Sequence, residues 1–152
     1  MRPTALRGDR RGVSTALGYV LNLGVMTVLV VGLVFTAGTY VEDQREGAIR
    51  AELVVVGEHL VADLGSADRL VASGASEVSV SQQVPESAAG VSYTVRVEES
   101  GGGQELVLST RDPAVTVRFD LVTETPVAGG ASGGDVRIDY DSAAGELEVR
   151  SD

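Results

Sequence analysis

Cysteine and lysine are both absent from this chain of 152 residues, and histidine occurs only once. Without cysteine the protein can form no disulfide, no thiolate metal site and no cysteine nucleophile. Without lysine it lacks the residue that follows the glycines of a nucleotide phosphate-binding loop. The lone His59 has no second histidine with which to share a zinc ion, and no serine and aspartate can be matched to it as a triad. We therefore expect His59 to be a helix-surface or packing residue.

Basic charge is scarce beyond the first twelve residues. The chain holds 22 acidic residues against 12 arginines, which gives a net charge of −10. Four of the arginines precede Val13, so residues 13–152 carry a net charge of −13. Because a phosphate backbone needs a basic face, this balance argues against binding to nucleic acid. It favours solubility through net charge instead.

Charged residues disappear entirely between Val13 and Val41, a run of 29 residues. As an α-helix, with a rise of about 1.5 Å per residue, this run would be about 43 Å long, against about 30 Å for the hydrocarbon core of a membrane. Secretory signals have an apolar region of only about 7–15 residues. We therefore predict a membrane-spanning helix over residues 13–41 that stays on the protein. A signal that is discarded near Thr36 and Gly38 is the alternative.

The two flanks of this run predict its orientation. Arg7, Arg10 and Arg11 precede it, whereas the flank that follows, residues 42–46, is net acidic. Positively charged flanks stay on the cytoplasmic side of a membrane. We expect a single-pass protein of the cell membrane, with a cytoplasmic N-terminus and an extracellular C-terminal domain.

The junction between the basic leader and the apolar run carries a family resemblance. The segment DRRGVSTALGYVLNLGVMTVLVV, residues 9–31, resembles the N-terminus of archaeal type IV pilin-like proteins, especially those of halophiles. In that family a membrane prepilin peptidase cleaves a short basic leader after its final glycine. The resemblance implies a leader over residues 1–12 and a processing site formed by Arg10, Arg11, Gly12 and Val13. The acidic, lysine-free composition is also similar to that of halophile proteins, although a GC-rich genome replaces lysine by arginine as well.

Processing of this kind would change what the helix can do. The leader arginines make it costly to draw the N-terminus into the bilayer, so the precursor stays inserted until they are removed. The resemblance then implies that the helix anchors the protein and packs against other pilin-like subunits, identical or different, in a filament or pseudopilus on the cell surface. Small residues let membrane helices approach closely, and the candidates for this packing are Gly18, Gly24, Gly32 and Gly38.

Two positions depart from the pattern of the family. Leu17 stands fifth after the proposed cleavage, where bacterial pilins have glutamate, and Thr15 stands where typical halophile pilins have proline. These departures favour a minor or accessory subunit of the archaeal kind. The alternative is a single-pass, signal-anchored protein whose outer domain binds a ligand or partner without polymerising.

Helical spacing continues beyond the apolar run, because no proline occurs between Pro3 and Pro85. Over residues 42–72 one apolar stripe recurs at intervals of three and four residues, and it consists of Ile49, Leu53, Val56, Leu60 and Leu64. We expect an amphipathic helix that continues the stem, docks on the outer domain and stops at Ser73-Gly74. Three glycines within it each cost about 1 kcal/mol relative to alanine, which allows a bend at Gly47, Gly57 or Gly65.

Over residues 73–152 the apolar period changes to two, which predicts half-buried antiparallel strands. Apolar and polar residues alternate clearly in three segments, and shorter candidates follow the same pattern; together they cover residues 90–99, 114–122, 135–141, 77–84, 104–110 and 146–150. The glycine-rich stretch 125–135 is predicted to be a mobile loop. The predicted fold class is α+β: a long N-terminal helix followed by a head of about six antiparallel strands, in a meander packed on the helix.

No group of residues in the head predicts catalysis. The best set of carboxylates is Asp135, Asp139 and Asp141, but alternate residues of one strand share a solvated face, and their spacing does not match a calcium-binding loop. We expect the arginines of the polar faces to pair with acids on neighbouring strands, and these are Arg96, Arg118 and Arg137. We expect no enzyme activity, no cofactor, and no catalytic or metal-binding residue.

Overall fold

The computed structural model describes the backbone of residues 10–152, and the side chains of all of these except residues 10–15 and Thr39. The first nine residues of the predicted leader therefore lie outside the described part. The chain divides into two compact units, residues 1–43 and 44–152. Helix α1 (Arg10–Ala72) contributes to both units, and all the strands belong to the second.

The second unit is an α+β head, as predicted, but it has eight strands instead of about six. They are β1 (Ser79–Gln83), β2 (Ser87–Ala88), β3 (Val91–Ser100), β4 (Gly103–Thr110), β5 (Thr116–Leu121), β6 (Val127–Ser132), β7 (Asp135–Asp141) and β8 (Glu146–Ser151). Their order in the sheet is β1-β7-β8-β6-β3-β4-β5, and the short β2 pairs with β3. The predicted meander is wrong, because β6 lies between β3 and β8 and runs parallel to β8.

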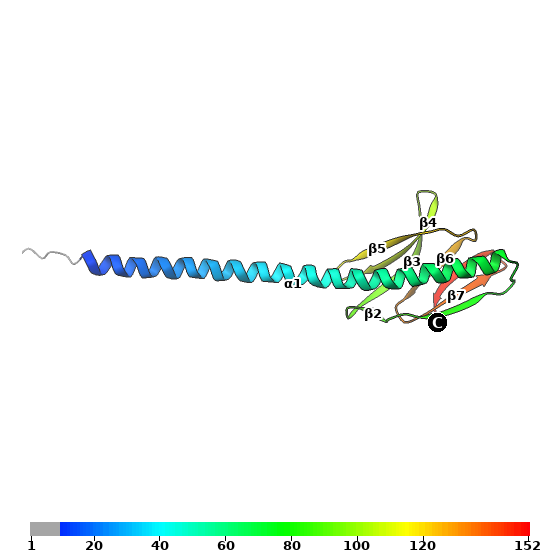
Figure 1. The fold of residues 1–152 in the computed structure, drawn as a ribbon, viewed down its shortest axis with the longest axis horizontal. Helices are drawn as coiled ribbons and strands as arrows, with labels where there is room; N and C mark the ends of the chain where they lie inside the picture. Colours follow the sequence, from blue (N-terminus) through cyan, green and yellow to red (C-terminus); the bar gives the residue numbers. More distant parts are fainter. Residues whose placement is uncertain (1–9) are drawn as a thin grey trace, which may run out of the picture. The chain divides into compact units, whose positions relative to one another are not determined.

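The part of α1 that belongs to the head lies along one face of this sheet (Figure 1). The predicted stripe provides the contact, and its five residues, Ile49, Leu53, Val56, Leu60 and Leu64, are each at most 4% exposed. From the sheet, the predicted inward-facing side chains complete the core, including those of Tyr93, Val95, Val136 and Ile138. Burial of each large apolar side chain contributes about 1.5–3 kcal/mol, so this contact holds the helix on the sheet.

The helix ends at Ala72, where the sequence predicted its stop. Gly74 follows with a φ of 95°, a conformation that glycine adopts without the penalty of a side chain. The N–H of Gly74 donates to the carbonyl of Val71 at 2.9 Å, and the N–H of Ala75 donates to that of Leu70 at 3.2 Å. These bonds satisfy carbonyls that the end of the helix leaves without a partner.

The glycine-rich stretch 125–135, predicted to be a mobile loop, contains strand β6 in the middle of the sheet. β6 pairs with β3 on one side and with β8 on the other. Neighbouring backbone leaves little room for side chains here. A Cβ on Gly129 would lie 2.4 Å from the carbonyl oxygen of Val149, and a Cβ on Gly130 would lie 2.6 Å from that of Val95. The prediction was wrong because glycine within a strand also marks the close approach of another backbone.

Gly57 of α1 lets the ring of Phe119 on β5 approach the helix closely. A Cβ on Gly57 would lie 2.0 Å from Cε2 of this ring. Gly47, one of the other glycines of the same helix, is exposed, and a Cβ there would meet no atom within 4 Å. The two glycines therefore have different roles, although helix propensity alone treats them alike.

We expect Gly57→Ala and Gly47→Ala to change the stability of the head in opposite directions. Alanine favours a helix by about 1 kcal/mol over glycine, so Gly47→Ala should raise the free energy of unfolding by about this amount. At Gly57 the new methyl group displaces the Phe119 ring at a cost of about 2 kcal/mol, which leaves a net loss of about 1 kcal/mol. Urea unfolding of the full chain in detergent micelles, followed by circular dichroism, measures both changes. A gain at both positions would contradict the role assigned to Gly57.

Candidate functional site

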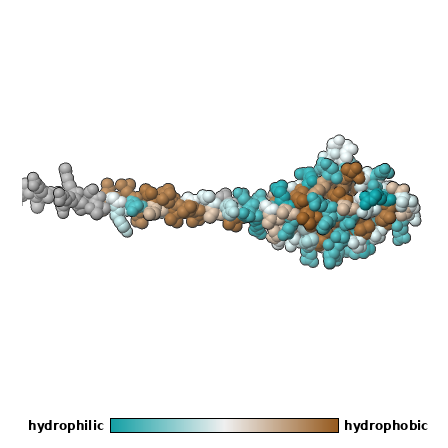
Figure 2. Space-filling model, in the orientation of Figure 1, coloured by the Kyte–Doolittle hydropathy of each residue, from teal (hydrophilic) through white to brown (hydrophobic). Residues whose placement is uncertain are grey.

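The first unit presents an apolar helix surface. From Ala16 onward the side chains of α1 that the structure describes in this unit are exposed. The most apolar window of 18 residues has a mean hydropathy of 2.3, and none of it is buried. Among its large apolar side chains, the exposed fraction ranges from 48% at Val31 to 76% at Phe35. Figure 2 shows this surface in brown. By length and composition, α1 can cross a membrane.

Polar side chains within this apolar segment fall into two kinds. The hydroxyl of Thr27 donates to the carbonyl of Leu23 at 2.8 Å, and the hydroxyl of Thr36 donates to that of Gly32 at 2.9 Å. Such bonds within a helix satisfy hydroxyl groups in hydrocarbon. Asn22 is exposed, and its amide makes no hydrogen bond within the described part of the chain. Asn22 is the one amide in the charge-free run, a signal that was visible in the sequence but was not assigned a role there.

The four predicted packing glycines leave open space on the surface of α1. A Cβ on any of Gly18, Gly24, Gly32 and Gly38 would meet no atom within 4 Å. At Gly24 the missing side chain leaves an apolar hollow of about 450 Å³, lined by Val20, Leu21, Val25, Val28 and Leu29. A hollow of this kind can accept a side chain from another helix, because small residues let helices approach closely.

The predicted processing site lies at the beginning of α1. Residues 10–13 have helical backbone, and their side chains are outside the described part. The chemistry of cleavage would belong to the peptidase, so this segment needs only to present a peptide bond. The rest of the leader, residues 1–9, lies outside the described residues.

The carboxylates singled out in the sequence have structural partners in the head. Asp139 accepts a hydrogen bond from the hydroxyl of Ser79 at 2.6 Å and forms an ion pair with Arg150. Asp141 accepts the N–H of Ala143 at 2.8 Å and so closes the turn between β7 and β8. Asp135 accepts a bond from Gln83 at 3.2 Å. No group of three or more His, Asp or Glu side chains that could hold a metal ion occurs among the described residues.

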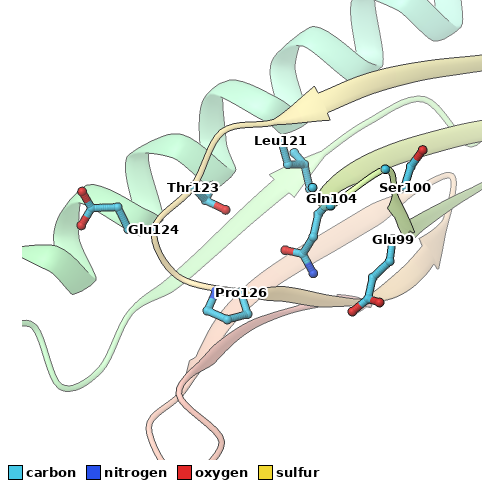
Figure 3. A pocket seen from close by; sticks show the side chains of 10 residues that line it. Glu99, Ser100, Gln104, Leu121, Thr123, Glu124 and Pro126 are labelled. Atoms are coloured by element: carbon cyan, nitrogen blue, oxygen red, sulfur yellow. The ribbon is translucent and has the colours of Figure 1, made fainter.

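The hollow beside the turn between β3 and β4 has a volume of about 660 Å³ but lacks converging chemical groups. Figure 3 shows the side chains of Glu99 and Glu124 on opposite sides of it. Gln104, which also lines it, has its amide occupied: it donates to the carbonyl of Val127 at 2.7 Å and accepts the N–H of the same residue at 2.8 Å. The role of Gln104 is therefore to join the beginning of β4 to the beginning of β6.

A second hollow, of about 670 Å³, lies between α1 and residues 82–88 and has His59 in its wall. His59 is exposed, as expected for a helix-surface residue. Tyr93, in the same wall, donates its hydroxyl to the carbonyl of Pro85 at 2.7 Å, and burial raises the pKa of Tyr93 to about 12. The phenol is therefore a fixed structural donor at neutral pH. Glu52, the carboxylate in the same wall, accepts the N–H of Ala89 at 2.6 Å and so has a structural partner.

These features define a class of protein: one helix long and apolar enough to cross a membrane near the N-terminus, followed by an α+β head. The chain belongs to DUF7266, a family of unknown function, which matches residues 8–152. No curated protein and no solved structure matches it.

Proposed function

We propose that this protein is an exported, pilin-like surface protein that enters the membrane as a precursor. In this proposal the N-terminus starts in the cytoplasm, a prepilin peptidase cleaves between Gly12 and Val13, and the head faces the outside. The mature helix then anchors the protein and packs into a filament or pseudopilus, as a minor or accessory subunit. The observation that carries the proposal is the exposed apolar surface of α1, which directly follows the basic leader and its glycine.

Two features of the helix support assembly after cleavage. The hollow at Gly24 offers a place for a side chain of another helix. Asn22 offers an amide that lacks a partner within the described chain, and a hydrogen bond between helices in a membrane contributes about 1 kcal/mol. Removal of the leader arginines takes away the charges that oppose movement of the N-terminus into hydrocarbon. Cleavage would thus convert an inserted anchor into a helix that can pack among others.

The experiment that tests this proposal is intact-mass and N-terminal analysis of the membrane-associated protein, produced together with its prepilin peptidase. We expect a mature N-terminus at Val13. Gly12→Asp should abolish processing and leave the complete precursor, because it changes the residue that precedes the cut bond. Gly8→Asp, the matched control within the leader, should be processed normally.

A different N-terminus would indicate a different kind of protein. An N-terminus at Met1 or Arg2 in the unchanged protein would overturn the pilin-like proposal and favour the signal-anchored protein whose head binds a ligand or partner without polymerising. A terminus near residue 39 would mean that the apolar segment is a discarded signal. Equal loss of processing in Gly8→Asp and Gly12→Asp would show a general effect of leader charge in place of a specific cleavage site.

A further inference from the structure

The face of the sheet that points away from α1 carries an ordered pattern of charge. Four strands, β3, β5, β7 and β8, each place an arginine and an acid two residues apart on this face, and β7 and β8 carry three further acids there, Asp135, Asp141 and Glu146. The four pairs are Arg96 with Glu98, Arg118 with Asp120, Arg137 with Asp139, and Arg150 with Glu148. On β4 the corresponding positions hold Glu105 and Val107. Their neighbours along each strand point to the core, so the pattern lies on the outer face.

The register of the strands aligns these charges by sign. Glu98 lies opposite Glu105, which lies opposite Asp120, and on the other half of the sheet Asp139 lies opposite Glu148. We call these five residues the acidic row. The arginines line up in the same way, with Arg137 opposite Arg150, and with Arg96 and Arg118 on either side of Val107. These four arginines form the arginine row.

Strand β6 joins the two halves of each row. Its Ala128 lies opposite Glu148 of the acidic row, and its Gly130 lies opposite Arg96 of the arginine row. Both rows therefore cross the sheet side by side, roughly perpendicular to the strands. The small residues of β6 leave the middle of this face without a bulky side chain.

This arrangement does not maximise the stability of a single head. Like charges directly opposite each other on neighbouring strands are destabilising, whereas opposite charges stabilise. Diagonal pairs offset part of the repulsion: Arg118 lies 3.8 Å from Glu105, and Arg150 pairs with Asp139. Arg137 pairs with Asp152, beyond the end of β8. Of the three arginine pairings predicted from the sequence, that of Arg96 does not form within the described residues.

We propose that this outer face binds the same face of a second copy of the chain, with the arginine row of each copy against the acidic row of the other. A two-fold axis that runs parallel to the rows and between them produces this match. It places Arg96 of one copy against Glu98 of the second, and Arg118 against Asp120. A two-fold axis along the strands would instead place like charges together, so the pattern selects one geometry.

The contact is isologous, since each pair of charges occurs twice. Sheets pack face to face at about 10 Å with their strands about 30° apart, so the charge match extends over a few neighbouring strands, such as β3 to β5. The pairing does not depend on cleavage of the leader, and it adds a contact between heads to any contact between apolar helices.

Two complementary variants of the full chain in detergent micelles test this proposal. One variant carries Arg96→Glu and Arg118→Glu, and the other carries Glu98→Arg and Asp120→Arg. We expect the unchanged protein to dimerise by sedimentation at low salt and to bind less tightly as the salt concentration rises. Each variant alone should dimerise at least tenfold more weakly. On β3 and β5, the two strands that carry the substitutions, both rows of a variant have charges of the same sign, so two copies of that variant repel each other there. An equal mixture of the two should recover the dimer.

Controls separate this contact from other causes of association. Arg50→Glu with Arg111→Glu makes the same change in net charge on exposed positions outside the two rows, and it should leave dimerisation unchanged. Arg96→Gln with Arg118→Gln should weaken the dimer less than charge reversal does, and it guards against a variant that fails to fold.

Two outcomes would overturn the proposal. Equal association in all variants would mean that the apolar helices, and not the heads, hold the copies together. Loss in both variants without recovery on mixing would overturn it as well. The N-terminus of the protein does not enter these readouts, so they fail or succeed independently of leader cleavage.

Discussion

Gly130→Ala is expected to lower the free energy of unfolding of the head by about 3 kcal/mol, at the upper end of what overpacking costs in a core. The added Cβ would lie 2.6 Å from the carbonyl oxygen of Val95 and 3.4 Å from the Cα of Arg96. Both neighbours are backbone atoms of β3, which is paired with β4 on its other side. Neither can move aside without disturbing two ladders of hydrogen bonds, so the strain cannot be relieved by turning a side chain.

Urea unfolding of the full chain in detergent micelles measures this loss. Gly103→Ala provides the matched control, since Gly103 is also a strand glycine, and its nearest contact for a Cβ is the carbonyl oxygen of Ser100 at 3.9 Å. We expect Gly103→Ala to change the free energy of unfolding by less than about 0.5 kcal/mol. If Gly130→Ala were equally mild, the close approach of β6 to β3 would not hold in solution.

Asp68→Asn is expected to lower the free energy of unfolding by about 2 kcal/mol at neutral pH. Asp68 lies on α1, is only 7% exposed, and accepts the N–H groups of Glu124 at 3.1 Å and of Thr125 at 2.9 Å. These bonds hold the connection between β5 and β6 against the helix. Asparagine keeps one acceptor oxygen but turns an NH₂ group toward the other N–H. Because hydrogen bonds to a charged group contribute about 1.5–3 kcal/mol, the lost bond explains the expected change.

The same carboxylate gives the effect a defined dependence on pH. Burial alone would raise the pKa of Asp68, but hydrogen bonds from Thr125 and Glu124, and the charge of Arg69, bring it below its ordinary value of 3.8. A pKa that is lower in the folded state gives stability that is complete above the unfolded pKa and is lost as the pH falls through the folded one. The difference between the unchanged protein and Asp68→Asn should therefore be full at pH 7 and shrink below about pH 4.

Urea titrations at pH 7 and pH 3 measure this dependence. Glu58→Gln is the control, because Glu58 is exposed on the same helix, and we expect a change within about 0.5 kcal/mol at either pH. A loss in Asp68→Asn that is the same at pH 7 and pH 3 would show that shape matters at this position and charge does not.

Much of the fold could be predicted from spacing alone. The stripe from Ile49 to Leu64 repeats at helical intervals and is buried as expected, and the strands with alternating apolar residues all form. The end of α1 at Ala72 and the hairpin turn between β3 and β4, where Gly101 and Gly102 have positive φ, also follow from local signals. The stripe and the strands each have one side that must face the core, and the helix end and the turn each depend on glycines at that position. In all of these cases residues close together in the sequence carry the signal.

The position of β6 and the order of the strands could not be predicted in this way. Residues 125–135 contain the glycines of a loop, and their role as a central strand depends on backbone from β3 and β8, which are remote in the sequence. Gly57 and Gly47 lie in the same predicted helix with the same helix propensity, and only the Phe119 ring in the structure shows that Gly57 is the one packed closely against the sheet.

The features of the candidate site also differ in whether the sequence alone could predict them. The apolar run, its basic leader and Gly12 are contiguous, so the sequence alone determined that the helix is long and apolar enough to span a membrane, because only length and composition are needed for that. The alignment of arginines and acids into two rows was decided by the tertiary structure. Each strand contributes at most one residue to either row, and the register that brings like charges together is set by which side chains the core buries.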